Sequence, residues 1–436
     1  MKILELPPTN QNISDAIEIM NRLDIEPIFQ KALNEALYWD KIKYLTLPEG
    51  VSHEAFWTAL KLFKIPKDPL VFGEFRFNIG LSKAHLKMLH EFDLNLGGSL
   101  LSGEKMDPLD RESFLISSLM EEAITSSQIE GAVTTRQMAK EMLIQNKKPV
   151  NESERMIYNN YITIRRIKEL ASQPISETLL LEVQQLITAK TLDNEKDSGR
   201  FRQNNEVRVV DALDGSVVHQ PPDFQDLPQL MRNYYDFFNL DNDEDFIHPV
   251  VKASILHFLI GFIHPFVDGN GRTARTIFYW YMLKKGYLLT EFLSISSIIL
   301  ISKTAYAKAF LYSETDELDL RYFLHYKLKV IKQAYNGLRE YINRKVKEKA
   351  IENQYLKIGG INERQAKLIK ILIDEPEKYF TVKEVQNRFG IVNQSARSDL
   401  RGLENLGFLR ATYVNKKKQI FIRSDDIISR LKEQTA

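Results

Sequence analysis

Residues 264–275 read HPFVDGNGRTAR and concentrate residue types that could do chemistry on a phosphate. Gly269 and Gly271 admit positive φ angles and let another group approach the backbone closely. A helix is predicted to begin directly after this loop, so its first amide groups and the positive end of its dipole would face an anion, usually a phosphate. Arg272 and Arg275 are three residues apart, so both can reach that anion from one face of the helix.

Two more side chains of this stretch could supply a metal ligand and a base. Asp268 precedes the loop, and a carboxylate beside a phosphate suits a hard divalent cation such as Mg²⁺. His264 lies one loop away and can act as a general base near neutral pH. A histidine after an apolar helix is by itself more often structural, and a Gly-containing pair is more often a turn. The combination at this spacing predicts nucleotidyl or phosphoryl transfer.

The stretch resembles the signature of the Fic family, His-Pro-Phe-x-[Asp/Glu]-Gly-Asn-Gly-Arg-x-x-Arg, at every fixed position. The resemblance implies a compact helical domain and protein adenylylation (AMPylation), in which AMP moves from ATP to a Ser, Thr or Tyr hydroxyl of a protein target and pyrophosphate leaves. It implies that His264 is the catalytic residue that deprotonates the hydroxyl. It also implies that Asp268 holds Mg²⁺ against the α- and β-phosphates.

The same resemblance assigns roles around the nucleotide. Arg272 would neutralise the phosphates during attack, and Arg275 would bind the γ-phosphate. Tyr306, in the helix after the second motif helix, would contact the adenine. The ATP-binding residues implied in this way are Gly269, Asn270, Gly271, Arg272, Thr273, Arg275 and Tyr306.

A short β-hairpin is predicted before the motif. Residues 206–210 alternate between polar and apolar side chains, Asp214 and Gly215 supply turn chemistry, and residues 216–218 are prone to form a strand. The hairpin resembles the Fic flap, and the preceding stretch 198–202 resembles the run into it. The resemblance implies that the hairpin binds the target segment by adding a strand. The target-binding flap residues are then Val217, Val218 and His219.

Residues 126–131, SSQIEG, resemble the inhibitory motif of the family, [Ser/Thr]-x-x-x-Glu-[Gly/Asn]. The resemblance implies that Ser126 and Glu130 form an inhibitory element in which Glu130 pairs with Arg275. The γ-phosphate would then lose its anchor and meet a like charge, and a displacement of about 1 Å can cost roughly a hundredfold in rate. We therefore expect an auto-inhibited adenylyltransferase. Some relatives also remove AMP with the same Glu, so the direction of the reaction stays open.

The body of the chain is predicted to be mainly α-helical, with the hairpin as a small flap. An apolar helix, 249–263, delivers His264 to its C-terminal end, where Pro265 stops it. The domains expected are an N-terminal helical region at 1–100 and a Fic catalytic domain at 101–345. Apolar residues at helical spacing predict helices at 52–63, 107–130, 152–170, 176–192, 225–238, 249–263 and 272–286, with further helical pattern through 303–350.

A second domain is predicted at the C-terminal end. Lys and Glu runs lead into Gly359 and Gly360, so residues 346–362 are interpreted as a linker. Residues 363–436 follow the order of a winged helix-turn-helix domain. Its predicted elements are helices at 364–374, 381–389 and 393–406, strands at 409–414 and 419–423, and a turn at 415–418 with three lysines.

This second domain supports an alternative function, a DNA-binding transcription regulator. Residues 361–436 carry 15 Lys and Arg against 10 Asp and Glu, a net charge of +5. Arg397 and Arg401 lie on the predicted recognition helix, and the three lysines of the turn could reach phosphates. Winged helices also dock proteins, and a DNA-binding module is compatible with an enzyme.

Two other motifs were weighed against these interpretations. Residues 98–105 nearly match a phosphate-binding P-loop, but Lys105 falls one place late and Met106 replaces Ser or Thr. His257 and His264, with Asp268 nearby, could suggest a metal hydrolase, but no His-Asp pair or Glu-x-x-His cluster completes such a site. Both are rejected in favour of nucleotidyl transfer.

Length and composition limit the remaining possibilities. The 436 residues suggest about three domains, and the net charge of +1 argues against a protein that coats polyanions along its whole length. The absence of cysteine excludes disulfides, thiolate metal sites and cysteine nucleophiles. The first residues lack the apolar segment of a signal peptide, and no apolar stretch reaches the roughly 20 residues that span a bilayer. We expect a cytoplasmic protein with no membrane partner and, because relatives are often dimeric, a homodimer.

Overall fold

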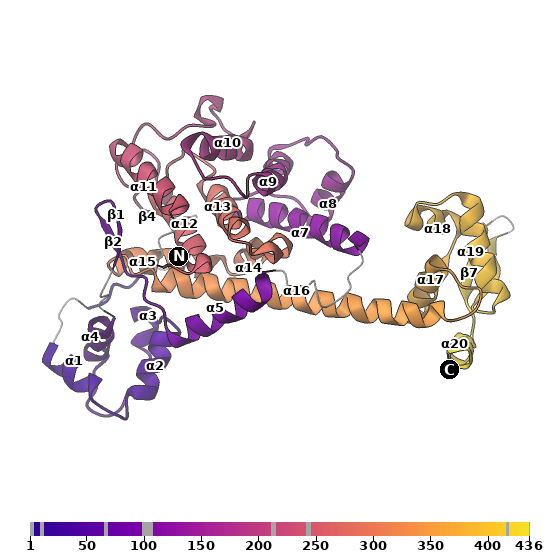
Figure 1. Cartoon of the computed structure of the whole chain (residues 1–436), viewed down its shortest axis with the longest axis horizontal. Helices are drawn as coiled ribbons and strands as arrows, with labels where there is room; N and C mark the ends of the chain where they lie inside the picture. Colours follow the sequence, from indigo (N-terminus) through magenta and orange to yellow (C-terminus); the bar gives the residue numbers. More distant parts are fainter. Residues whose placement is uncertain are drawn as a thin grey trace. The chain divides into compact units, whose positions relative to one another are not determined.

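The computed structural model describes residues 4–8, 13–64, 69–97, 108–210, 215–240, 246–415 and 418–435. The chain is mainly α-helical, as predicted, and divides into two compact units, Met1–Leu338 and Arg339–Ala436 (Figure 1). Some predictions fall outside the described residues. These are the rejected P-loop stretch 98–105, Asp107 at the start of the inhibitory helix, Asp214 in the flap turn, and Lys416 and Lys417 in the C-terminal turn.

The first unit opens with short helices and a hairpin. Its elements are α1 (Ile13–Met20), α2 (Glu26–Asn34), α3 (Trp39–Ile42), α4 (His53–Phe63), β1 (Leu70–Phe72), β2 (Phe75–Phe77) and α5 (Lys83–Leu96). The predicted helix at 52–63 is confirmed, with Ser52 as its cap, because the Ser52 hydroxyl accepts a hydrogen bond from the Ala55 amide. Helix α4 buries Phe56 and Trp57 in an apolar cluster with the helices before it. The antiparallel β1–β2 hairpin is not evident from the sequence, because each strand has only three residues.

The rest of the first unit contains the predicted inhibitory helix, flap and motif helices, with ends that differ by a few residues from the prediction. These elements are α7 (Pro108–Ile129), α8 (Arg136–Ile144), α9 (Glu152–Glu169), α10 (Glu177–Thr188), η1 (Glu195–Asp197), β3 (Val209–Val210), β4 (Val217–His219), η2 (Phe224–Asp226), α11 (Leu227–Asn239), α12 (Pro249–Ile263), α13 (Asn270–Lys284), η3 (Leu288–Phe292), α14 (Ile295–Ile301), α15 (Lys303–Thr315) and α16 (Arg321–Leu356). Strands β3 and β4 pair antiparallel, as expected for the hairpin.

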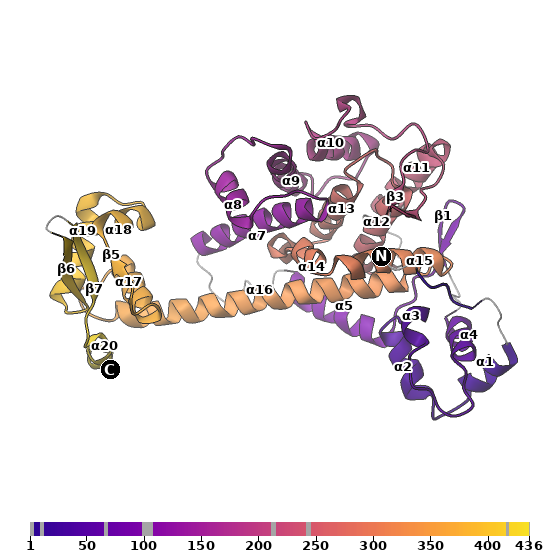
Figure 2. The same ribbon diagram turned by 180° about the vertical axis from the view of Figure 1, so that it is seen from behind.

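Helices α12 and α13 form the centre of this unit and position the motif. Helix α12 is apolar on every side and buried along its length, which is typical of a helix surrounded by others. It lies beside α13, and α7, α9, α10 and α11 pack around the pair (Figure 2). Residues 264–269 connect the two helices, so the packing of the core fixes both ends of the motif loop.

Helix α16 extends into the predicted linker at 346–362. The helix continues through Leu356, because the Lys, Glu and Ala residues of this segment are good helix formers and their charges do not interrupt it. Only the residues from Lys357 to the next helix at Glu363 are non-helical, and they include Gly360 at φ +85°. The domain boundaries at 100, 345 and 363 stay predictions.

The second unit contains the predicted helices and strands of residues 363–436. These elements are α17 (Glu363–Asp374), β5 (Tyr379–Phe380), α18 (Val382–Phe389), α19 (Asn393–Asn405), β6 (Leu409–Asn415), β7 (Lys418–Arg423) and α20 (Ile427–Thr435). The strands form an antiparallel sheet in the order β5-β7-β6, and the sequence pattern reveals neither β5 nor α20. The winged-helix assignment of this unit stays a prediction. Within the described residues, no helix is long and apolar enough to cross a membrane.

Candidate active site

His264 ends helix α12 with its ring held as a neutral base. Its backbone is left-handed, with φ at +48°, and its amide donates to the Ile260 carbonyl at 3.0 Å. Its Nδ1 lies 3.1 Å from the Gly261 carbonyl, which can only accept, so Nδ1 carries the proton and Nε2 keeps its lone pair. Burial lowers the pKa of His264 to about 4. The predicted base is therefore unprotonated at neutral pH.

Arg202 fixes the backbone at this histidine through hydrogen bonds. The sequence does not predict this role. The side chain is 3% exposed, and its Nε donates to the His264 carbonyl at 3.0 Å. The Arg202 amide also donates to the Pro265 carbonyl at 2.9 Å, and the Phe201 ring stacks on Phe266 with 5.5 Å between centroids. Residues 198–202 resemble the run into the flap, and this resemblance is the one signal in the sequence that points to them.

The glycine loop opens helix α13 at Asn270, two residues earlier than predicted. Gly269 caps the helix with φ at +83°, and a Cβ atom there would lie 2.8 Å from Thr188 Cγ2, so glycine is required on both counts. The first helical hydrogen bond runs from the Thr273 amide to the Gly269 carbonyl at 2.8 Å. The amides of Asn270, Gly271 and Arg272 therefore have no acceptor within the helix, as an anion site requires.

The side chain of Asn270 contacts the backbone of Phe266. Its Nδ2 donates to the Phe266 carbonyl at 2.8 Å, and its Oδ1 accepts from the Phe266 amide at 3.0 Å. These two bonds close the loop between Phe266 and the helix start. Asn270 thus fixes the shape of the loop, with one of its two Nδ2 hydrogens used in this way.

Arg272 is buried at the start of α13 and links the loop to α10. Its Nη1 donates to the Ile187 carbonyl at 3.2 Å, and its Nη2 forms a 2.8 Å ion pair with Asp268. Its Nε is buried and has no hydrogen-bond partner among the described residues. The hydroxyl of Thr273 is also buried there without a partner. Buried polar groups of this kind normally find an acceptor, so both groups are candidates for an anionic ligand.

Asp268 stands at the rim of the loop, with its side chain 51% exposed. Arg272 engages its Oδ2, which leaves Oδ1 for a cation. No cluster of three or more His, Asp or Glu side chains is placed to hold a metal in the part of the chain that the structure describes. A single carboxylate nevertheless fits Mg²⁺, which keeps several waters and is usually bound by one or two carboxylates together with substrate phosphates.

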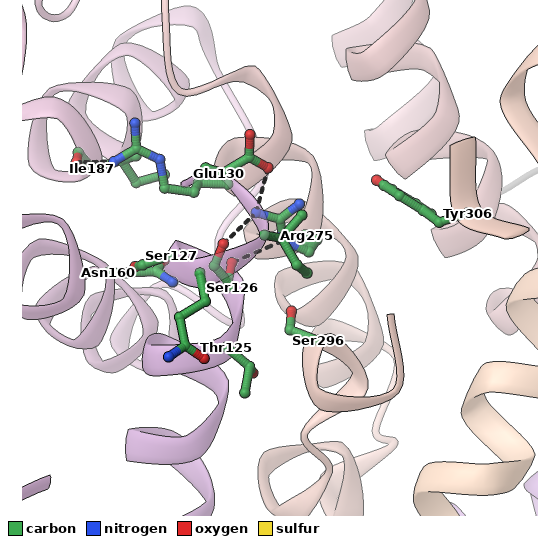
Figure 3. A network of polar contacts seen from close by, with 12 residues as sticks. Thr125, Ser126, Ser127, Glu130, Asn160, Ile187, Arg275, Ser296 and Tyr306 are labelled. Carbon is green, nitrogen blue, oxygen red and sulfur yellow. Dashed lines mark hydrogen bonds and ion pairs between the residues drawn. The ribbon is translucent and has the colours of Figure 1, made fainter. Parts of the chain in front are cut away.

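Glu130 and Ser126 lie against Arg275, as predicted for the inhibitory element (Figure 3). The Glu130 carboxylate lies 2.8 Å from Arg275 Nη2, and Arg275 Nε donates to the Ser126 hydroxyl at 2.8 Å. Arg275 Nη1 is buried with no partner among the described residues. Burial raises the pKa of Glu130, but the positive charges of Arg275 and Arg272 outweigh burial and lower it overall. The carboxylate is therefore ionised at neutral pH.

The end of helix α7 fixes Glu130 in this position. Gly131 has φ at +100°, its amide donates to the Gln128 carbonyl, and the Ala132 amide donates to the Ser127 carbonyl. This pair of bonds is a Schellman motif, which closes a helix with glycine in the left-handed position. The other side of the contact also requires glycine, because a Cβ atom on Gly271 would lie 2.2 Å from Glu130 Oε1.

The flap residues differ from one another in what they offer to a target. Val217 is half exposed on β4, and Val218 is partly buried. His219 instead turns inward: its Nε2 lies 2.8 Å from the Phe262 carbonyl and its Nδ1 lies 2.6 Å from a Glu314 carboxylate oxygen. Burial lowers the pKa of His219, but the hydrogen bond and charge of Glu314 raise it overall. His219 therefore anchors the flap to α15 and α12, and its ring offers no spare nitrogen to a target.

Tyr306 lies on α15, and not in the helix directly after the motif helix, because η3 and α14 intervene. Its hydroxyl lies 2.8 Å from His257 Nε2. Figure 3 shows the hydroxyl directed toward Arg275. The predicted contact with adenine stays a prediction. His257, weighed above as a metal ligand, uses both ring nitrogens in contacts with Tyr306 and Lys327.

Comparisons of sequence identify the family of the central region. The sequence model of the Fic/DOC family matches residues 174–282. A protein adenylyltransferase Fic from Nematostella vectensis is 35% identical over 91 residues, which cover 21% of this chain and 19% of the relative. A protein of the same name from Drosophila willistoni is 36% identical over 91 residues, which cover 21% of this chain and 16% of the relative. The matched part therefore spans about a fifth of the length of these relatives.

Solved structures share the fold over a larger part of the chain. A Fic family protein from Desulfovibrio desulfuricans G20 superposes with a TM-score of 0.53 at 19% identity, covering 80% of this chain and 99% of that chain. Fic-1 from C. elegans superposes with a TM-score of 0.51 at 17% identity, covering 77% of this chain and 90% of that chain. Likeness at these identities concerns the fold alone. Since residues 174–282 match the family model and include the complete motif, this part of the chain is a Fic domain.

Proposed function

We propose that this protein is an adenylyltransferase that moves AMP from ATP to a hydroxyl group of a protein target. One observation carries the proposal: buried donors of Arg272, Thr273 and Arg275 have no acceptor among the described residues, at a helix start that follows a neutral histidine. These donors match a chain of phosphates, because buried N–H and O–H groups are costly to leave unpaired. The relatives that are 35% and 36% identical to this chain over 91 residues are named protein adenylyltransferases.

The reaction follows from the groups in place. His264 Nε2 takes the proton of the target hydroxyl, and the hydroxyl oxygen attacks the α-phosphorus of ATP. The bond from the α-phosphorus to the bridging oxygen breaks, and pyrophosphate leaves with the electron pair. The helix amides and Arg272 stabilise the negative charge that develops on the phosphates. Mg²⁺, held by Asp268 Oδ1, would neutralise the phosphates when bound.

Glu130 inhibits this reaction in the proposed account. Its carboxylate occupies Arg275 Nη2 and the space beside Gly271, where the γ-phosphate would be bound. A triphosphate that enters this site meets a like charge and loses a guanidinium contact, so its α-phosphate is held out of line for attack. Withdrawal of Glu130 would free Arg275 and start the transfer.

Position-specific labelling tests the function directly. ATP labelled on the α-phosphate should label protein in the presence of the Glu130→Gly variant, whereas ATP labelled on the γ-phosphate should not. Label from the γ-phosphate on protein would indicate a kinase and refute the proposal, as would the absence of any protein label. Mass spectrometry of the labelled proteins from a lysate then identifies the target and the modified residue type. Loss of label from that target on incubation with wild-type protein would reveal the reverse reaction.

We infer a second, accessory function for the C-terminal unit, DNA binding through helix α19. Arg397 is exposed on this helix, whereas Arg401 pairs with Glu404 at 2.6 Å and lies over the Phe421 ring. A gel shift with the full-length protein at two salt concentrations tests this. Binding that weakens with salt and with the Arg397→Ala variant supports it, whereas no shift at low salt refutes it.

A further inference from the structure

Three polar side chains form a series of hydrogen-bond contacts near Arg275, and two of them have no role in the proposed reaction. Lys327 on α16 is 1% exposed and His257 on α12 is fully buried. The Lys327 ammonium lies 3.3 Å from His257 Nδ1, and His257 Nε2 lies 2.8 Å from the Tyr306 hydroxyl. The three residues thus form one hydrogen-bonded chain that ends at the nucleotide site proposed above.

Lys327 is an unusual residue for this position in the core. Its ammonium lies 4.0 Å from the centre of the Phe278 ring and makes no ion pair with any carboxylate that the structure describes. The buried carboxylate of Glu122 is instead bonded by the Ser294 hydroxyl and by the amide and hydroxyl of Ser296. Burying an ammonium without such a partner destabilises the fold, and methionine or leucine would fill the same space at lower cost. The charge therefore calls for a functional explanation.

The chemistry of the three groups fixes the direction of the chain. A lysine ammonium can only donate, so His257 Nδ1 must accept. A neutral imidazole that accepts at Nδ1 carries its proton on Nε2, so Nε2 donates to the Tyr306 oxygen. The proton of the Tyr306 hydroxyl must then point away from His257. Figure 3 shows this hydroxyl on the side of Tyr306 that faces Arg275 and Glu130.

We propose that Lys327 and His257 are positioning residues that hold the Tyr306 hydroxyl as a hydrogen-bond donor toward the anion bound by Arg275. In the present conformation that anion is the Glu130 carboxylate. Once Glu130 withdraws, it is the terminal phosphate of ATP. The inference rests on the proposed nucleotide site, but it concerns a contact that is separate from any contact of the Tyr306 ring with adenine.

The surroundings of Lys327 make the direction of this hydrogen-bonded chain depend on pH. Burial lowers the pKa of Lys327 to about 7, with Glu122 on α7 opposing the shift and Arg275 on α13 adding to it. His257 on α12, the third polar group that faces the ammonium, is neutral, because burial and the charge of Lys327 hold its pKa well below the usual value. As the pH rises through about 7, Lys327 loses its proton and can accept from His257, so the direction of the chain is no longer fixed.

Nucleotide binding in the Glu130→Gly background tests the proposal, because Arg275 is then free of its carboxylate. Tyr306→Phe should weaken ATP binding about tenfold, the loss expected for a hydrogen bond to a charged group, and should leave AMP binding unchanged. Lys327→Met should lower the ATP affinity in the same way, and the double variant should lose no more than either single variant. Lys332→Met, on the same helix but paired with Glu91 at the surface, is the matched control and should bind both nucleotides normally.

Failure of the proposed hydrogen-bonded chain and failure of the proposed function give different results. No ATP binding by the Glu130→Gly protein would refute the proposed function itself. If Tyr306→Phe binds ATP with an unchanged ratio of ATP to AMP affinity, the hydrogen-bonded chain alone is refuted. This includes the case in which both affinities fall equally. Should Lys327→Met not fold, the pH dependence decides: the ratio of the ATP affinity with Tyr306 present to that of Tyr306→Phe must fall above about pH 7, and a constant ratio would refute the proposal.

Discussion

The Glu130 carboxylate lies 2.8 Å from Nη2 of Arg275, in the second turn of helix α13. Glu130 directly follows helix α7 and Arg275 lies on α13, far along the sequence, and residues at the end of α7 hold both. The Schellman motif at Gly131 fixes Glu130, and the Ser126 hydroxyl and carbonyl fix Arg275 at 2.8 and 3.0 Å. A side chain held in this way keeps one orientation, so in the proposed account Glu130 competes with phosphate for a preformed site.

Substitution of Glu130 should separate the effect of its charge from the effect of its bulk. Glu130→Gln keeps the size and removes the charge, whereas Glu130→Gly removes both. We expect the rate of AMP transfer to rise in the order wild type, Gln, Gly, with the last about a hundredfold above the first. Initial rates with labelled ATP measure this. Glu121→Gln is the control, because Glu121 lies on α7 and pairs with Arg136, and its rate should match wild type. Equal rates in all four proteins would show that Glu130 does not inhibit transfer.

The pH dependence of transfer should reflect a buried base. Transfer needs His264 without a proton on Nε2, and burial lowers its pKa to about 4, so the base form persists well below the usual value of 6.5. The rate should therefore stay level as the pH falls to about 5 and decline only below it. The kcat/KM profile of Glu130→Gly, with circular dichroism to confirm folding at each pH, measures this. A decline centred near pH 6.5 would show that His264 is solvated or is not the base.

The two hydrogen bonds between the Asn270 side chain and the Phe266 backbone should contribute to stability as well as to transfer. Asn270→Ala leaves the buried amide and carbonyl of Phe266 without their partners, which should cost about 2–4 kcal/mol in the free energy of unfolding. Urea unfolding of the full chain measures the cost. Asn233→Ala removes a surface contact with Gln229 and should change stability by less than about 0.5 kcal/mol. A loss of transfer without a loss of stability would instead indicate that the Asn270 side chain binds the nucleotide.

The local sequence was sufficient to predict the elements that carry the motif. Apolar residues on every side of 249–263, the stop at Pro265 and the glycines after it determine where α12 ends and α13 begins. The ion pair of Glu130 and Arg275 was also predicted, but from family resemblance and not from spacing. The helix over the first part of 346–362 is not evident from the sequence, because the charge runs resemble a break although the residues favour a helix. The role of this segment as a linker stays a prediction.

The contacts that complete the site could not be predicted from local patterns. His219 meets Glu314 across 95 residues of sequence, and Lys327 meets His257 across 70. Neither pair has a characteristic spacing, because each depends on how helices pack in three dimensions. The Asn270 side chain shows a different limit: its residue type suits either a phosphate or a backbone partner, and only the loop geometry places it on Phe266.

The most direct test measures AMP transfer and ATP binding together in the Glu130→Gly protein with and without His264→Ala. We predict that α-labelled ATP labels protein in the single variant, that this label disappears in the double variant, and that calorimetry finds similar ATP affinity in both. Transfer that persists without the imidazole, or an ATP site that is lost with it, would contradict the assignment of His264 as the base beside a triphosphate bound at the start of α13.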